Sequence, residues 1–180
     1  PCRPLSGRDR HYLPGVSLNS LILKRDGDSG FYLNQMVSLQ NKVHGAKPQL
    51  PFWLKDILGE KIEQSPVLHW VQKNALMKKL DELPEGAALC HGDFHGANIL
   101  FHEGRYTIID WIDAALGCVQ ADACRTYMLY HFYAPDVAES YLDCYCSNCG
   151  CEKNDVLQWL PVIAAARLSD GKAREYDKIQ

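Results

Sequence analysis

Apolar residues recur at helical spacing along most of this chain. One face of the stretch 31–45 carries Leu33, Met36, Val37, Gln40, Val43 and His44, and Gly45 follows as a stop, so the pattern predicts a helix there. The same criterion predicts a short helix over 53–62 and longer ones over 67–83, 121–133, 136–146 and 154–168. Pro161 is expected to kink the last of these, and the polar end, 172–180, is expected to be a fraying helix. At 180 residues one mainly helical domain is the natural expectation.

A different pattern lies between residues 89 and 117, where short apolar runs are interrupted by polar residues. The runs 99–101 and 106–109 are rich in β-branched and aromatic residues, and Gly104 lies between them, so the stretch predicts a β-hairpin. With a turn centred near Gly104, position 98 faces position 110, and directly opposed Cβ atoms lie about 5 Å apart. Asn98 and Asp110 would then supply two hard oxygen ligands of the kind that magnesium prefers.

Asp93 stands five residues before Asn98, on the loop that enters the hairpin. A carboxylate beside a metal site can accept the proton of a hydroxyl group as that group attacks phosphorus. The alternative is a purely structural role, in which the segment is a hairpin with a polar loop at its open end. Any one acidic residue would fit that alternative, but three polar residues at these spacings fit it poorly.

The wording of the motif, H-G-D-F-H-G-A-N followed by I-I-D-W, resembles the aminoglycoside phosphotransferase and choline kinase family of the protein-kinase-like superfamily. The resemblance implies that Asp93 is the catalytic base, that Asn98 and Asp110 hold Mg²⁺ with the phosphates of ATP, and that His91 is a structural member of the loop. It continues through A-D-A-C-R-T-Y, where Asp122 and Arg125 fall at matching positions. Asp122 can either cap the next helix or brace the catalytic loop. The family usually has G-D-P after the hairpin, and this chain departs from that pattern at Cys118.

The fold implied by the resemblance is the large, C-terminal lobe of a bilobal kinase, mainly helical with one small hairpin, over residues 31–180. Residues 1–30 form a poorly defined segment, read either as a disordered terminus or as a hinge remnant, since L-P-G-V-S-L-N-S-L weakly resembles the family's hinge. The N-terminal nucleotide lobe would then be missing. The implied reaction is ATP-dependent transfer of the γ-phosphate to a hydroxyl group of a small molecule. The alternative is a truncated, non-catalytic lobe that acts as a binding module.

The inward face of the helix expected over 67–83 should carry Val71, Ala75, Leu76 and Leu80. Two side-chain groups remain ambiguous at this level. The aromatic stripe formed by Tyr127, Tyr130, His131, Phe132 and Tyr133 is either core or a wall of the acceptor pocket. Asp113 either has a surface role or joins the metal or contacts substrate. The acceptor itself and the oligomeric state are not defined by the sequence.

The composition limits the classes of partner that can be expected. The net charge of −3 gives no broad attraction to nucleic acid or to an anionic membrane, so the expected partners are a nucleotide and a small-molecule hydroxyl acceptor. Eight cysteines raise the possibility of disulfides, but the start of the chain lacks the apolar core of a signal peptide, so reduced thiols in the cytoplasm are expected. The cluster C-x-C-x-x-C-x-C has four thiols (Cys144, Cys146, Cys149 and Cys151). These are expected to be free rather than bound to zinc, because no long spacer separates the pairs.

Overall fold

The computed structural model describes residues 13–24 and 28–169, and within them the fold is mostly helical with two small sheets. The longer helices are α2 (Ser29–His44), α3 (Leu54–Gln64), α4 (Trp70–Glu82), α5 (Val119–Tyr133), α6 (Pro135–Cys149) and α8 (Leu160–Ser169). The shorter ones are α1 (Leu18–Ile22), η1 (Gly96–Asn98) and α7 (Lys153–Leu157). The strands are β1 (Val16–Ser17), β2 (Ala88–Cys90), β3 (Ile99–His102), β4 (Arg105–Ile108) and β5 (Ala115–Gly117). The mainly helical prediction is therefore confirmed.

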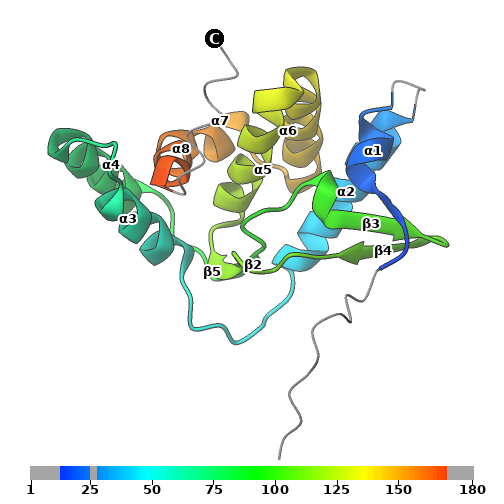
Figure 1. Ribbon diagram of the computed structural model, residues 1–180, viewed down its shortest axis with the longest axis horizontal. Helices are drawn as coiled ribbons and strands as arrows, with labels where there is room; N and C mark the ends of the chain where they lie inside the picture. Colours follow the sequence, from blue (N-terminus) through cyan, green and yellow to red (C-terminus); the bar gives the residue numbers. More distant parts are fainter. Residues whose placement is uncertain (1–12, 25–27, 170–180) are drawn as a thin grey trace, which may run out of the picture.

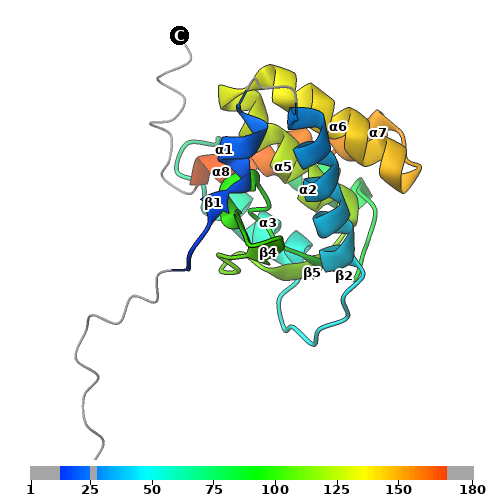
Figure 2. The same ribbon diagram turned by 90° about the vertical axis from the view of Figure 1, so that its right-hand side faces the viewer.

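Helix α5 lies at the centre of the molecule, with α6 on one side, α8 on the other and α7 behind (Figure 1). Its buried side chains include Met128 and Tyr130, and they share one hydrophobic core with Met36 of α2 and Tyr141 of α6. The pair α3 and α4 extends to one side and packs mainly on α8, while α1, α2 and the three-stranded sheet lie on the other side (Figure 1). Figure 2 shows the same arrangement end-on, with α2 running beside α5 and α6. The segment from His91 to Asn98 thus enters a scaffold that is helical on both sides.

The predicted hairpin is present, but its register differs by one residue from the expectation. Strands β3 and β4 pair from Ile99 with Ile108 to His102 with Arg105, leaving a two-residue turn. Both turn residues have positive φ, 47° at Glu103 and 78° at Gly104, as tight hairpins require. Consequently Asn98 faces Ile109, whose backbone N–H donates to its carbonyl oxygen at 3.0 Å. The expected pairing of positions 98 and 110 is therefore wrong by one residue.

The segment before residue 30 contributes more structure than its sequence suggested. Strand β1 pairs with β3 through Val16–Phe101 and Ser17–Leu100, which makes the hairpin a three-stranded antiparallel sheet. Helix α1 follows directly and buries Leu18 and Ile22 in the core. Short strands carry little periodicity of their own, so this pairing could only be found in three dimensions. Residues 1–12 and the end of the chain from 170, including the expected helix over 172–180, lie outside the described residues.

Two helical predictions needed correction. The expected helix over 154–168 is two helices, α7 and α8, and Pro161 lies near the start of α8 instead of kinking one long helix. Proline fits there because the first turn of a helix has no partner for its backbone N–H. Helix α4 begins at Trp70, later than expected, and the predicted inward face is only partly right. Leu80 is buried, whereas Val71 is 57% exposed and Ala75 is also exposed, because α4 packs along its C-terminal half.

No helix in the described part of the chain is long and apolar enough to span a membrane. The clustered thiols of Cys144, Cys146, Cys149 and Cys151 are free cysteines at the end of α6 and in the loop that follows. Among the described residues no three His, Cys, Asp or Glu side chains are grouped so that they could hold a metal ion. That the protein carries no zinc remains a prediction, which elemental analysis of the purified chain would test.

Candidate active site

Strand β2 leads directly into the loop that carries the H-G-D motif, and His91 fixes the start of that loop. The His91 side chain is fully buried, with its ring 4.6 Å from that of Trp111 between centroids. Its Nδ1 accepts a hydrogen bond from the backbone N–H of Asp93 at 3.3 Å, so Nε2 carries the proton and donates to the carbonyl oxygen of Ile109 at 3.0 Å. One imidazole thereby ties the catalytic loop to the end of the hairpin.

Gly92 makes the sharp turn between His91 and Asp93. Its φ is +80°, in the region that favours glycine, and a Cβ atom at this position would collide with the carbonyl oxygen of Asp113. The loop therefore passes directly against the segment that follows the hairpin. A side chain at position 92 would separate the two segments and displace Asp93.

The carboxylate of Asp93 is surrounded by nitrogen donors. His95 Nε2 lies 3.3 Å from Oδ2, the side-chain Nδ2 of Asn98 donates to the same oxygen at 3.1 Å, and Arg125 lies 3.5 Å from Oδ1. Burial raises the pKa of Asp93, but the hydrogen bond and charge of His95 and the charges of Arg125 and Arg167 outweigh it and hold the pKa well below its ordinary value. The group is therefore ionised at neutral pH and available as an acceptor.

Asn98 directly precedes β3 and Asp110 follows β4, so both residues lie at the open end of the hairpin. Asn98 Nδ2 donates to both the backbone carbonyl and the carboxylate of Asp93, and no described residue donates to its Oδ1. Asp110 is exposed, with φ of +63° in the left-handed region, and no described residue hydrogen-bonds to its carboxylate. Such a conformation costs a non-glycine residue of order 1–3 kcal/mol and is found most often at functional sites. Asn98 thus has a side-chain oxygen beside Asp93, and Asp110 has an exposed carboxylate just after β4, neither with a donor among the described residues.

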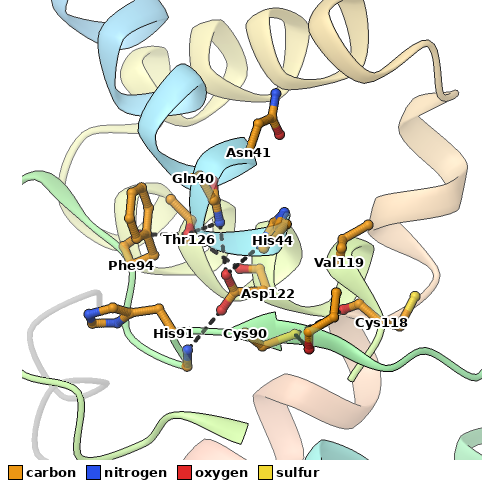
Figure 3. A network of polar contacts seen from close by, with 12 residues as sticks. Gln40, Asn41, His44, Cys90, His91, Phe94, Cys118, Val119, Asp122 and Thr126 are labelled. Carbon is orange, nitrogen blue, oxygen red and sulfur yellow. Dashed lines mark hydrogen bonds and ion pairs between the residues drawn. The ribbon is translucent and has the colours of Figure 1, made fainter. Parts of the chain in front are cut away.

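Asp122 supports the loop through a hydrogen bond to its backbone (Figure 3). Its Oδ1 accepts from the backbone N–H of Gly92 at 2.8 Å, and its Oδ2 contacts His44 Nε2 at 2.9 Å and accepts from Gln40 Nε2 at 3.1 Å. Asp122 is 1% exposed, and although burial raises its pKa, His44, the Gly92 amide and Gln40 hold it below the ordinary value. Of the two roles considered for this residue, the hydrogen bond from the Gly92 N–H is that of a loop brace, and no side chain caps the start of α5.

The hydrogen bonds continue outward from Asp122 into α6 and back to the loop. Tyr141 donates to Gln40 Oε1 at 2.6 Å, and Thr126 donates to the carbonyl oxygen of Phe94 at 2.6 Å. Figure 3 shows Gln40, His44, Thr126 and Phe94 gathered around Asp122 from three different elements. Burying a polar group costs several kcal/mol unless it is paired, so this network fixes the loop relative to α2 and α5.

Sequence reasoning missed several of these supports. His95, which contacts Asp93, lies inside the recognised motif and could have been singled out by its position two residues after the aspartate. Tyr141 and Thr126 have no local signal, since Tyr141 is separated from its partner Gln40 by 101 positions. Arg125 lies where the motif placed it, beside Asp93.

A small cavity of about 110 Å³ opens beside Gly92, between α3, α5 and α8. Three cationic residues, Lys61, Arg125 and Arg167, line it together with Asp113 and aliphatic side chains. No member of the aromatic stripe lines it. Tyr127 and Tyr130 are instead buried, at 7% and 0% exposure, as the core interpretation expects, whereas Tyr133 is 52% exposed. Asp113 therefore lies at the edge of a cavity that adjoins the candidate catalytic loop.

Comparison with solved structures identifies the class of fold. The choline kinase LicA from Streptococcus pneumoniae superimposes with a TM-score of 0.62 at 14% identity, over 92% of this chain and 64% of that one. A thermostable mutant of the aminoglycoside phosphotransferase APH(4)-Ia, in a ternary complex with ADP and hygromycin B, gives 0.58 at 16% identity, over 90% and 64%. The amicoumacin kinase hAmiN, in complex with AMP-PNP, Ca²⁺ and Ami, gives 0.58 at 15%, over 89% and 56%. The fold is that of the small-molecule kinases.

The sequence places the chain within that class. Residues 18–159 match the phosphotransferase enzyme family (APH), and the chain belongs to that family. No curated protein matches the sequence. The chain spans less than two thirds of the length of the three solved structures named above. The family resemblance inferred from the motif is thus confirmed, whereas the roles of single residues are proposals.

Proposed function

We propose that this chain is the large lobe of an ATP-dependent phosphotransferase that moves the γ-phosphate to a hydroxyl group of a small molecule, with cytoplasmic ATP as the donor. The observation that carries the proposal is the geometry around Asp93, whose carboxylate is held by His95, Asn98 and Arg125. Phosphoryl transfer depends mainly on positioning and on charge neutralisation, so a fixed acceptor for the hydroxyl proton suits the reaction.

Asp93 would accept a hydrogen bond from the acceptor hydroxyl and take its proton late, after bond breaking to the leaving group is advanced. A carboxylate with a lowered pKa is a weak base, but it orients a neutral hydroxyl well. Arg125 beside it would keep the carboxylate ionised and in one orientation. His91 and Asp122 would act through the backbone, by holding residues 92 and 93 in place.

The donor set fits a magnesium ion with nucleotide phosphates. Asn98 Oδ1 and the Asp110 carboxylate are oxygens that lack a hydrogen-bond donor among the described residues, and magnesium prefers oxygen ligands while retaining several waters. When bound there, Mg²⁺ would neutralise the negative charge of the phosphates during transfer. The left-handed conformation of Asp110 turns the chain directly after β4, and it would keep this carboxylate at the mouth of the loop.

We further propose that residues 31–180 correspond to the family's C-terminal lobe and that the adenine and the outer phosphate contacts come from a separate nucleotide lobe. The partial coverage of the solved relatives supports this division. In kinases a glycine-rich loop and a lysine of the small lobe orient the phosphates. Positioning can supply about 7–11 kcal/mol of barrier reduction, so residues 1–180 alone should turn over ATP several powers of ten more slowly than a two-lobed enzyme.

The test compares ATP turnover by residues 1–180 with turnover by a version extended upstream in the parent reading frame. Asp93→Asn is made in each, with Asp136→Asn on the exposed start of α6 as a control of equal charge change. Loss of a general base costs typically 10²–10⁴-fold, so the extended protein should lose about that factor with Asp93→Asn and nothing with the control.

Each outcome decides between the candidates. Robust Asp93-dependent turnover by residues 1–180 alone would disprove the need for a second lobe. Absence of turnover in the extended protein with every hydroxylated acceptor tried would instead favour a non-catalytic binding module. Binding of MgATP that survives Asp93→Asn but is lost with Asp110→Asn would support the metal-holding role of Asp110.

A further inference from the structure

Four cysteines gather at the C-terminal end of α6, and the proposed phosphoryl transfer uses none of them. Three belong to the last turns of the helix and the fourth follows Gly150, namely Cys144, Cys146, Cys149 and Cys151. All four are free cysteines. Cys146 is buried, Cys149 is exposed, and the other two are half-buried. Because their surroundings differ, each thiol has its own set of contacts.

Two of the thiols are directed at α2. The thiol of Cys144 donates to Asn34 Oδ1 at 3.3 Å, and the thiol of Cys149 donates to Asn41 Oδ1 at 3.3 Å. Both asparagines belong to α2, which packs along α6. These two hydrogen bonds therefore join the two helices.

The other two thiols meet each other across the turn that ends α6. Gly150 has the left-handed φ of +66°, and the backbone N–H groups of Gly150 and Cys151 both donate to the carbonyl oxygen of Cys146, at 2.9 Å and 3.3 Å. A helix end of this type brings the residue after the glycine against the last turn of the helix, usually as an apolar contact. Here the contact joins two sulfur atoms, and the Cys151 thiol is hydrogen-bonded to Cys146 Sγ.

The two thiols do not hold their protons equally. Burial raises the pKa of both, and it raises that of Cys151 to about 12. The hydrogen bond between them lowers the pKa of Cys146 and raises that of Cys151, so Cys151 is the donor. Cys146 is therefore the sulfur that ionises first. A thiolate with a thiol beside it is the arrangement in which one sulfur attacks and the other completes a disulfide.

We propose that Cys146 and Cys151 form a reversible disulfide on exposure to a peroxide, so that the end of α6 is a site of oxidative modification. The Cys146 thiolate attacks one peroxide oxygen and the O–O bond breaks, which leaves a sulfenic acid on Cys146. The released hydroxide takes up the proton that Cys146 gave up and becomes water. The Cys151 thiol then attacks the oxidised sulfur, and the hydroxyl group leaves as water with the Cys151 proton. Two thiols are oxidised, and one peroxide is reduced to two waters.

The modification would fix the junction between α6 and α7. The backbone hydrogen bond from Cys151 to Cys146 already holds the two residues together, and a disulfide forms only between residues whose Cα atoms are about 4.4–6.8 Å apart. Neither cysteine is among the residues that line the small cavity beside Gly92. The site is thus separate from the candidate catalytic loop.

The test oxidises reduced residues 1–180 with hydrogen peroxide in the presence of EDTA, then unfolds the protein, labels the remaining thiols with N-ethylmaleimide and digests it with trypsin. Cleavage after Arg125 and Lys153 yields peptide 126–153, which carries all four thiols of the cluster and no other cysteine. Mass spectrometry of this peptide is expected to show two labels instead of four, together with the loss of two hydrogen atoms. Treatment with dithiothreitol before labelling should restore all four labels.

Paired variants assign the bond. With Cys144→Ser and Cys149→Ser combined, only the proposed pair remains in the peptide, and both labels should still be lost. With Cys146→Ser and Cys151→Ser combined, the same number of thiols remains, but they are directed at α2. Their labels should be lost at least about tenfold more slowly, because the reacting groups lack proximity. The first variant tests the pairing even if the second is unstable, because its peptide holds no other pair.

Four results would overturn the proposal: four labels retained after oxidation, equal rates of loss in the two variants, a gain of oxygen atoms without a disulfide, or a disulfide between two copies of the chain on a non-reducing gel. The measurement requires neither ATP nor an acceptor. Failure here therefore leaves the proposed phosphoryl transfer untouched, and failure of that function leaves this site untouched.

Discussion

Two groups of carboxylates in this protein are held in opposite ways. Asp122 contacts the candidate catalytic loop, is 1% exposed, and has a donor from each of three directions, namely Gly92, His44 and Gln40. Five exposed carboxylates (Asp56, Glu60, Glu63, Asp81 and Glu85) instead line a large opening between α3 and α4, with only Lys55 as a cationic neighbour in its walls. A buried charge that is paired on every side fixes a conformation, whereas an exposed charge is stabilised by water. The difference separates a structural support from a solvated surface.

The largest expected effect comes from removing the buried carboxylate. Asp122→Ala leaves the Gly92 N–H, His44 and Gln40 without their acceptor, and breaking a buried charged network from one side typically costs about 3–5 kcal/mol. Urea unfolding followed by circular dichroism measures the free energy of unfolding. Asp113→Ala, an exposed aspartate beside Gly92, is the control and should change it by less than about 0.5 kcal/mol. Equal losses in the two variants would show that Asp122 is not the anchor.

The pH dependence of stability should report the same network. The pKa of both Asp122 and Asp93 is lowered in the folded protein, so the folded state binds fewer protons than the unfolded state around their ordinary pKa of about 4. Their contribution is therefore fully present above that pH and is lost as the pH falls below it. Urea midpoints measured between about pH 7 and pH 3 should drop steeply at the acid end. Asp93→Asn should flatten part of this drop, and an unchanged profile would contradict the assignment.

A smaller effect is expected one step further from Asp122. Tyr141→Phe removes the hydroxyl that donates to Gln40 Oε1 at 2.6 Å and leaves that oxygen buried without a donor. An unsatisfied buried acceptor costs about 1–3 kcal/mol. Tyr133→Phe makes the same chemical change at a side chain that is 52% exposed, and it should be nearly neutral in the same unfolding measurement. A neutral Tyr141→Phe would show that Gln40 does not depend on α6.

The smallest effect on stability is expected among the exposed carboxylates between α3 and α4. Glu60→Gln together with Glu63→Gln removes two exposed charges from an acidic region, so the free energy of unfolding should stay within about 0.5 kcal/mol or rise slightly. Thermal unfolding at low salt is the measurement, since screening is weakest there. A loss of more than about 1 kcal/mol would mean that these carboxylates hold the fold together, contrary to the comparison with Asp122.

The candidate site shows which residues could be predicted from local sequence patterns and which could not. Asp93, Asn98 and Asp110 could be named because the motif is continuous or nearly so in sequence, and the family that it indicated is confirmed. The register between Asn98 and Asp110 was off by one residue, since two-residue and longer turns differ little in composition around Gly104. His95, Thr126 and Tyr141 were not predicted as parts of the site, because a histidine in a loop and polar residues in helices are common and have no distinctive spacing.

The sequence by itself determined the mainly helical class, the hairpin and the family, and it proposed a short list of candidate residues, because periodicity and a local motif depend on neighbours within a few positions. Only the tertiary structure decided that β1 joins the hairpin, that Gln40, His44, Asp122 and Tyr141 share one buried network, and that α3 has a different cavity on each face. These features bring together residues up to 101 positions apart, and which of them meet is decided by packing of the whole core.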